Sequence, residues 1–204
     1  MSNTQNLQGK KIAILATNGF EQSELVEPKT LFTEQGAKVD ILSIEDQTTI
    51  KAWDEDNWGK EVDVDLQVSS ANLEDYDALV LPGGQINPDV LRTNNDAVAF
   101  ISKANGTDSI KAIGAICHGP WLLVESGLAD GATLTSFPSI KTDLQNAGAT
   151  WVDEEVVNKY EQIKLPMKVG DFLFFDQYLM HRSGYNSTKD EIRFSLVISD
   201  SDPE

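Results

Sequence analysis

The chain has 204 residues, a length that suits one α/β domain or one domain with a short appendage. Hydrophobic residues make up 40% of the sequence, enough for a sizeable core. The formal net charge is −17, with 33 acidic side chains against 16 basic ones. This balance argues against nucleic acid and against anionic membrane surfaces as partners, because both bind to cationic surfaces.

Cysteine usage and the N-terminal stretch indicate the compartment. Cys117 is the only cysteine, so no intrachain disulfide can form and nothing points to an oxidising compartment. The opening stretch MSNTQNLQGKK is polar and lacks the apolar centre of a signal peptide. No apolar run approaches membrane-spanning length. We therefore expect a soluble cytoplasmic protein.

Short apolar runs alternate with helical patterns along most of the chain. Runs rich in apolar and β-branched residues predict buried strands. The expected strands are 10–17, 37–44, 77–84, 109–116, 132–136 and 150–157. The stretch 51–76 is polar and alternating, and we expect it to hold loops and a small hairpin.

Helix start and stop signals fall between these runs. Ser23 is the expected N-cap of the first helix, and Gly36 is its C-terminal stop. A later helix is expected to begin near Asn94 or Asn95, and Gly148 closes the last one. The expected helices lie after Ser23, as two pieces within 87–105, at 120–127 and at 139–148.

The alternation predicts βαβ units, a mostly parallel sheet and helices on both of its faces. Sites in such sheets gather at the carboxyl ends of the strands. Three loops are expected to meet there: 18–24 (NGFEQSE), 82–89 (PGGQINPD) and 117–120 (CHGP). The composition changes after about residue 157, so we expect one domain at 1–157 and a β-rich extension at 158–204, with strands at 171–175 and 193–199.

The turn at Cys117 has the pattern of a nucleophile site. A sharp strand-to-helix turn exposes the side chain at its apex, and Gly119 and Pro120 suit such a turn. The helix N-terminus is expected to lower the thiol pKa, and nearby N–H groups can face an oxyanion. The alternative is a buried cysteine that acts as a small hydrophobe. His118 is either catalytic, structural or bonded to a neighbouring subunit.

These residues resemble the DJ-1/PfpI superfamily, and within it the PfpI-like branch of small stress-response proteins. The similar segments are IAILATNGFEQSEL followed by EP, LVLPGG, and AICHGPWLLVESG with the sequence that continues to DEEVV. Together they cover about residues 10–157 in register. The resemblance implies a flavodoxin-like, doubly wound α/β fold with a reactive cysteine at the turn.

The resemblance also assigns roles at the predicted site. It implies that Cys117 is the nucleophile, that His118 is its neighbouring histidine and that Glu24 hydrogen-bonds the thiol, with Glu21 nearby. Asp89 matches an acidic residue that reaches the histidine of another subunit. Gly84 matches a backbone N–H donor of the oxyanion pocket, together with the N–H of His118.

Simpler roles remain open for several of these residues. Glu24 can be a solvated acid at a helix N-terminus, although a protonated Glu24 would donate a hydrogen bond to a thiolate and stabilise it. Asp89 can be a first-turn helix acid that follows Pro88. Phe137 stands where some relatives carry tyrosine, so we expect it only to pack.

The tail resembles the final strands of phytanoyl-CoA-hydroxylase-like dioxygenases, which use iron and 2-oxoglutarate. His181 and Arg193 match a distal iron ligand and the arginine that binds the 2-oxoglutarate carboxylate. A facial triad also needs a second histidine and a carboxylate. The only other histidine is His118, at the thiol turn. We therefore expect no iron there. The tail is expected to reflect a gene fusion, a truncated chimera or a segment used for packing, as a hairpin on the sheet face or against another subunit.

Three functions follow as hypotheses. The first is glyoxalase-like or deglycase-like conversion of reactive aldehydes such as methylglyoxal, free or as adducts on proteins, with no metal or organic cofactor. The second is peptidase-like amide hydrolysis by the same thiol. The third is a non-enzymatic redox sensor or chaperone. The resemblance also implies a homo-oligomer, such as a dimer.

Overall fold

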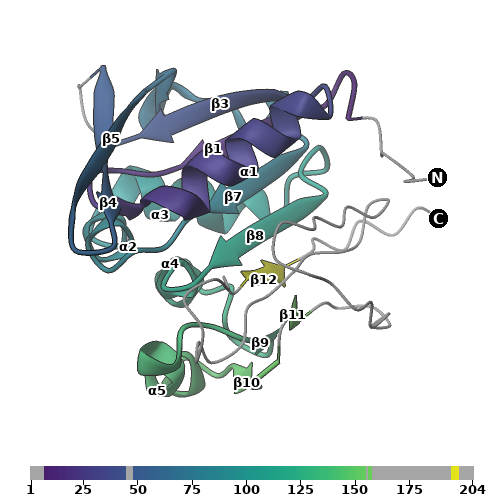
Figure 1. Cartoon of the computed structure of the whole chain (residues 1–204). Coiled ribbons are helices and arrows are strands. Elements are labelled where there is room, and N and C mark those ends of the chain that lie inside the picture. Colours follow the sequence, from purple (N-terminus) through teal and green to yellow (C-terminus); the bar gives the residue numbers. More distant parts are fainter. Residues whose placement is uncertain (1–6, 45–47, 155, 158–193, 198–204) are drawn as a thin grey trace, which may run out of the picture.

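The computed structural model describes residues 7–44, 48–154, 156–157 and 194–197 (Figure 1). Strands and helices alternate along most of these residues. The elements are β1 (Lys11–Leu15), β2 (Phe20–Glu21), α1 (Gln22–Glu34), β3 (Lys38–Ser43), β4 (Thr49–Asp54), β5 (Asn57–Asp63), β6 (Leu66–Gln67), η1 (Val68–Ser70), η2 (Leu73–Asp75), β7 (Ala78–Leu81), α2 (Ile86–Leu91), α3 (Asn95–Ala104), β8 (Ala112–Ile116), α4 (Pro120–Glu125), β9 (Thr133–Leu134), η3 (Pro138–Ile140), α5 (Lys141–Asn146), β10 (Thr150–Trp151), β11 (Val156–Val157) and β12 (Phe194–Val197).

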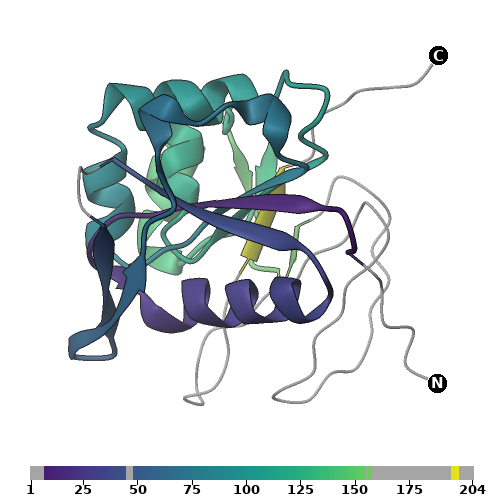
Figure 2. The ribbon, with the colours of Figure 1, turned by 90° about the horizontal axis from the view of Figure 1, so that it is seen from above.

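A mostly parallel sheet forms the centre of the molecule. Its strand order is β11-β12-β8-β7-β1-β3-β6, and every neighbouring pair is parallel except β12 with β8. Figure 2 shows α1 on one side of this sheet and α3 on the other. The predicted flavodoxin-like α/β fold, with helices on both faces, is confirmed.

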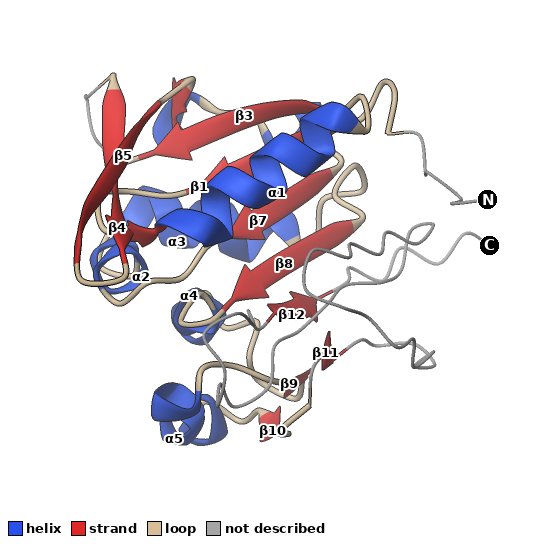
Figure 3. Cartoon of the chain, viewed as in Figure 1, coloured by secondary structure: helices blue, strands red, loops and turns tan. Residues whose placement is uncertain are grey.

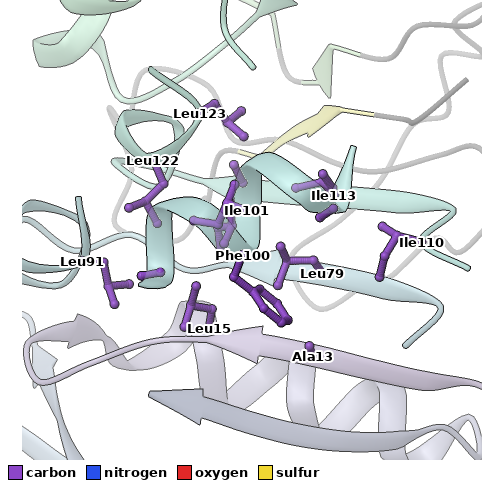
Figure 4. Packing of buried hydrophobic residues seen from close by; sticks show 14 of the residues in the cluster. Ala13, Leu15, Leu79, Leu91, Phe100, Ile101, Ile110, Ile113, Leu122 and Leu123 are labelled. Carbon is purple, nitrogen blue, oxygen red and sulfur yellow. The ribbon is translucent and has the colours of Figure 1, made fainter. Parts of the chain in front are cut away.

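Burial on both faces explains why the strands are apolar almost throughout. Along β1, Ala13 and Leu15 pack into the cluster on one face, while Ile12 and Ile14 pack into the cluster on the other. Successive side chains of a strand point to opposite faces, so both sets must be apolar when both faces are covered. Figure 4 shows part of the first cluster, where residues of β1, β7, β8, α3 and α4 meet.

The polar stretch after β3 forms the predicted hairpin. β4 and β5 pair antiparallel, and β2 joins β4 in a separate three-stranded sheet. The rings of Trp53 and Trp58 meet edge to face, with centroids 5.4 Å apart. Because β2 leads directly into α1, this small sheet ties the hairpin to the start of that helix.

Most predicted helix ends agree with the structure, and one does not. Gly36 has φ +93° just after the C-cap of α1, and the Asn94 side chain accepts a hydrogen bond from Ala97 N–H at the start of α3. Ser23 is not an N-cap, because α1 already begins at Gln22 with Glu21 as its cap. The short strand β2 fixes Glu21 in an extended conformation, so the helix starts two residues earlier than the capping preference of serine suggested.

The tail contributes one described strand. β12 pairs antiparallel with β8, with Phe194 opposite Ile116, and parallel with β11. The predicted strand at 193–199 is therefore confirmed over Phe194–Val197. It joins the sheet side by side with β8 and does not lie on a sheet face. The predicted strand at 171–175 lies outside the described residues, and the domain boundary at 157 stays a prediction.

None of the helices in the described part of the chain has the length and apolar character needed to cross a membrane.

The packed core predicts that truncating a side chain at its centre strongly lowers the free energy of unfolding. Leu79 of β7 is fully buried, whereas Leu66 of β6 is 40% exposed. Leu79→Ala should lower the free energy of unfolding by about 3 kcal/mol, because it removes buried methyl groups and leaves a cavity. Leu66→Ala is the control and should cost less than about 1 kcal/mol. Urea denaturation of the two variants measures both values, and equal losses would contradict this packing.

Candidate active site

Cys117 sits at the end of β8 in a strained backbone conformation. Its φ is +56°, in the left-handed region that non-glycine residues rarely adopt. α4 begins three residues later at Pro120, so the predicted strand-to-helix turn is present. Figure 3 shows β3 and β8 ending toward the same edge of the sheet, with α4 beside the tip of β8. The backbone turn thus places the thiol at the carboxyl edge, where ligands of such sheets bind.

Glu24, which comes from a different segment of the chain, lies against this thiol. It lies on α1, is 4% exposed, and its Oε2 accepts a 2.7 Å hydrogen bond from the N–H of Gly83. Its side chain also hydrogen-bonds Cys117. A Cβ at Gly83 would lie 2.7 Å from Glu24 Oε2 and 2.8 Å from Cys117 Cβ, so only glycine lets the three segments meet. The predicted contact between Glu24 and the thiol is therefore present.

Glu24 and Cys117 affect each other's protonation. Burial raises the pKa of Glu24 from 4.5 to about 8, the Gly83 N–H lowers it, and the charge of Glu21 raises it. Burial also raises the pKa of the Cys117 thiol well above its ordinary value, and the charge on Glu24 raises it further. Two negative charges in this pocket are unfavourable, so the pair keeps at least one proton at neutral pH.

The prediction that the helix N-terminus lowers the thiol pKa is wrong. α4 has only six residues and starts beyond the thiol, whereas burial and the Glu24 carboxylate act directly on the sulfur. The N–H groups of Gly84 and His118 do lower the thiol pKa, but they do not outweigh burial. A thiolate at Cys117 therefore depends on a proton that stays on Glu24.

Those two N–H groups are the pair predicted to face an oxyanion. Both Gly84 and His118 donate backbone hydrogen bonds to Cys117. Gly84 has φ +77°, and a Cβ there would lie 2.6 Å from the carbonyl oxygen of Gly19. The loop after β7 therefore needs glycine to present its N–H to the sulfur. Their part in catalysis stays a prediction.

His118 is buried beside the thiol and not turned away from it. Its Nδ1 lies 3.2 Å from Cys117 Sγ, and its Nε2 lies 3.1 Å from Ser139 Oγ. The ring is 4% exposed and stacks on Phe137, with centroids 4.7 Å apart. Burial lowers the pKa of His118 to about 4, so the ring is neutral at pH 7. A neutral imidazole beside a thiol can exchange a proton with it.

The remaining predicted residues lie farther from the sulfur. Asp89 is exposed in the first turn of α2, and the ring nitrogens of His118 are bonded to Cys117 and Ser139. The predicted bond between Asp89 and a histidine of another subunit stays a prediction. Glu21 caps α1, and its N–H donates to the Gly83 carbonyl at 3.4 Å. Burial raises the pKa of Glu21, and the charge of Asp54 raises it further.

Two residues at the site were missed from the sequence. Asn87 is fully buried; its Oδ1 accepts from Thr17 N–H at 2.8 Å, and its Nδ2 donates to the Pro82 carbonyl at 2.8 Å. It thereby fixes the loop after β7 to the end of β1. Ser139 is the partner of His118 Nε2. The asparagine in the loop that follows the Gly-Gly pair was a signal for Asn87, but no sequence pattern singled out Ser139.

No group of three or more His, Cys, Asp or Glu side chains is placed to hold a metal ion within the residues that the structure describes. His181 and Arg193, matched above to an iron ligand and a 2-oxoglutarate contact, lie outside those residues.

The sequence profile of the DJ-1/PfpI family matches residues 10–163. The chain belongs to the DJ-1/PfpI family. General stress protein 18 of Bacillus subtilis is 42% identical over 155 residues, which cover 76% of this chain and 87% of that protein. A deglycase of Pyrococcus horikoshii is 42% identical over 147 residues, covering 72% of this chain and 84% of the relative. Deglycases and a stress protein are therefore among the relatives of this DJ-1/PfpI protein.

Solved structures agree with the fold. A two-domain protein of Anabaena variabilis with DJ-1/ThiJ/PfpI-like and ferritin-like domains superposes with a TM-score of 0.66 and 32% identity, over 72% of this chain and 41% of that one. DJ-1 of Schizosaccharomyces pombe gives a TM-score of 0.62 at 21% identity, over 72% of this chain and 78% of that one. The resemblance of the tail to 2-oxoglutarate dioxygenases is not supported by these similarities, which lie in the α/β domain.

The raised pKa of Glu24 predicts how stability changes with pH. The folded state keeps a proton that Glu24 loses above about pH 4.5 when unfolded, so this stabilisation is full below pH 4.5 and lost as the pH rises toward about 8. Glutamine does not titrate, so the Glu24→Gln variant does not lose this stability as the pH rises. The difference in unfolding free energy, wild type minus variant, should fall by about 3–5 kcal/mol across this window, measured by urea denaturation at each pH.

Glu27→Gln is the matched control, since Glu27 lies on the same helix and is exposed. Its difference curve should stay nearly flat. The lowered pKa of His118 makes stability fall as the pH drops from 6.5 toward 4, but this effect is common to all three proteins and cancels in the difference. A flat curve for Glu24→Gln would show that Glu24 is not held protonated.

Proposed function

We propose that Cys117 is the nucleophile of a cofactor-independent enzyme with glyoxalase-like or deglycase-like activity on reactive aldehydes such as methylglyoxal. One observation carries the proposal: a single sulfur is surrounded by an acid, a neutral imidazole and two N–H donors. Relatives named as deglycases, at 42% and 38% identity, support the same chemistry. The substrate is a small aldehyde or its adduct on a protein.

The first step is addition of the thiolate to the aldehyde carbon. A C–S bond forms, and the carbonyl π electrons move to oxygen, which takes a proton to give a hemithioacetal. Once the Cys117 proton has left, protonated Glu24 donates its hydrogen bond to the thiolate and is then placed to supply that proton. The N–H groups of Gly84 and His118 can stabilise the charge that develops on oxygen.

The second step moves hydrogen within the bound substrate. Glu24, now a carboxylate, removes the proton from the former aldehyde carbon and returns it to the adjacent carbon, so the hemithioacetal becomes the thioester of a 2-hydroxy acid. Water then attacks the thioester carbonyl, the C–S bond breaks, and the hydroxy acid leaves while the thiol regains its proton. Methylglyoxal and one water thus give one lactate, and none of these steps draws on a metal or an organic cofactor.

The contact between sulfur and imidazole favours a second candidate, peptidase-like amide hydrolysis. The 3.2 Å separation of Cys117 Sγ and His118 Nδ1 suits a nucleophile and its base. This proposal also needs Asp89 of another subunit to orient His118, and hence an oligomer. Casein cleavage that follows oligomer state would favour it. The redox-sensor hypothesis also requires a thiolate, because a thiol oxidises more slowly than a thiolate and burial raises the thiol pKa.

Replacing the nucleophile tests the main proposal. Cys117→Ser should abolish methylglyoxal loss and hydroxy-acid formation, because a serine hydroxyl is a far weaker nucleophile without a strong base. Loss of methylglyoxal can be followed by absorbance and the product by chromatography, with the melting temperature as a check on folding. Turnover equal to that of the wild type would contradict the proposal.

Replacing Glu24 tests whether turnover needs its proton or only the size of its side chain. Glu24→Gln keeps the size of the side chain but cannot give up or take a proton, so kcat should fall by about 100- to 10,000-fold with a small change in KM. Glu27→Gln, the exposed change on the same helix, should retain wild-type kcat. A kcat for Glu24→Gln within about twofold of wild type would remove Glu24 from the mechanism.

A further inference from the structure

Ser139 is a hydrogen-bond partner of His118 that leads toward solvent. It lies in η3 and is exposed, while His118 is buried. Its Oγ is 3.1 Å from His118 Nε2, and His118 Nδ1 is 3.2 Å from Cys117 Sγ. The three side chains therefore form a continuous line of polar atoms from the half-buried sulfur to the surface.

Aromatic rings hold the imidazole in this line. Phe137 stacks on it at 4.7 Å with an interplanar angle of 23°, and Trp121 packs against it at 5.5 Å. Phe137 also donates its backbone N–H to the carbonyl oxygen of Cys117 at 2.8 Å, which fixes the start of η3 to the thiol turn. The ring cannot turn without losing these contacts, so each nitrogen keeps its partner.

The two protonation states of sulfur need opposite tautomers of a neutral His118. A thiol donates S–H to Nδ1, which leaves the ring proton on Nε2, donated to Ser139 Oγ. A thiolate accepts from Nδ1–H, and Nε2 then accepts from the Ser139 hydroxyl. A hydroxyl group fits both states, because it donates and accepts.

We propose that Ser139 is a positioning residue that relays a proton between buried His118 and solvent and so stabilises the tautomer that matches thiolate at Cys117. When sulfur ionises, its proton moves to Nδ1, the Nε2 proton moves to Ser139 Oγ, and the hydroxyl proton of Ser139 moves to water. One proton leaves the site, the ring stays neutral throughout, and no bond to carbon changes.

The surroundings favour a relay that keeps the ring neutral. Burial lowers the pKa of His118 to about 4, so a path through a charged imidazolium is unfavourable. The titratable and charged groups around this line are Glu24 at the sulfur, with Glu21 behind it, and Asp143 and Arg92 on the Trp121 ring. The hydrogen-bond partner on the Nε2 side is Ser139.

The proposal rests on the proposed function of Cys117 as nucleophile, but its first test needs no substrate. The rate of Cys117 alkylation by iodoacetamide, followed by mass across pH, reports how readily thiolate forms. Ser139→Ala should slow alkylation at neutral pH by about five- to tenfold, the value of one hydrogen bond, and move the rise of the profile to higher pH. Ser139→Thr keeps the hydroxyl and should restore the wild-type profile.

Ser136→Ala is the matched control from the same loop. The Ser136 hydroxyl donates to the Phe137 carbonyl and accepts from Trp151 Nε1, so its loss changes the packing of this loop without removing either hydrogen bond of the His118 ring. Its alkylation profile should overlie that of the wild type even if its melting temperature falls.

A Ser139→Ala profile that overlies the wild type overturns the proposal, as does a slowed profile that Ser139→Thr fails to restore. Methylglyoxal turnover of the same variants is the second readout, and kcat should fall in parallel with alkylation. If the wild type reacts with iodoacetamide but not with methylglyoxal, the proposed function fails while the role of Ser139 is still decided by the alkylation profiles.

Discussion

One proton shared by Glu24 and Cys117 governs the chemistry of this site. Glu24 is buried and Cys117 is half-buried, and burial raises the pKa of each. Two negative charges at this distance would repel each other strongly in a medium that screens poorly. The carboxyl therefore keeps its proton near neutral pH and offers it to the sulfur. This arrangement makes the acid both the stabiliser of the thiolate and the proton source closest to a substrate bound there.

The backbone around Glu24 and Cys117 allows three chain segments to come into contact. Gly83 leaves room for Glu24 and Cys117 to meet, and the positive φ of Cys117 aims its side chain at the carboxyl. Asn87 uses both ends of its amide to tie the Gly-Gly loop to the end of β1. A strained φ and a fully buried amide are unfavourable on their own. The surrounding core, built on both faces of the sheet, supplies the stability that holds them.

The histidine works under the same constraint as the acid. A charged imidazolium would be unfavourable in this enclosed position, as the lowered pKa of His118 shows. Neutral His118 can still pass a proton if each nitrogen has a partner of the right kind. Its two partners are the sulfur on one side and an exposed hydroxyl on the other. Thiolate formation then depends on the positions of protons on neutral groups and not on fixed positive charges.

The sequence by itself determined the fold class and the strand-to-helix turn at Cys117, and its resemblance to the DJ-1/PfpI family predicted the contact between Glu24 and the thiol. Apolar periodicity, glycines and one distinctive motif are local signals, and the folded chain keeps the local structure that they predict. The tertiary structure alone decided the direction of the thiol pKa, the place of β12 beside β8, and the roles of Asn87 and Ser139. Burial, strand pairing and contacts between distant segments depend on the whole packed chain, and no local pattern of residues encodes them.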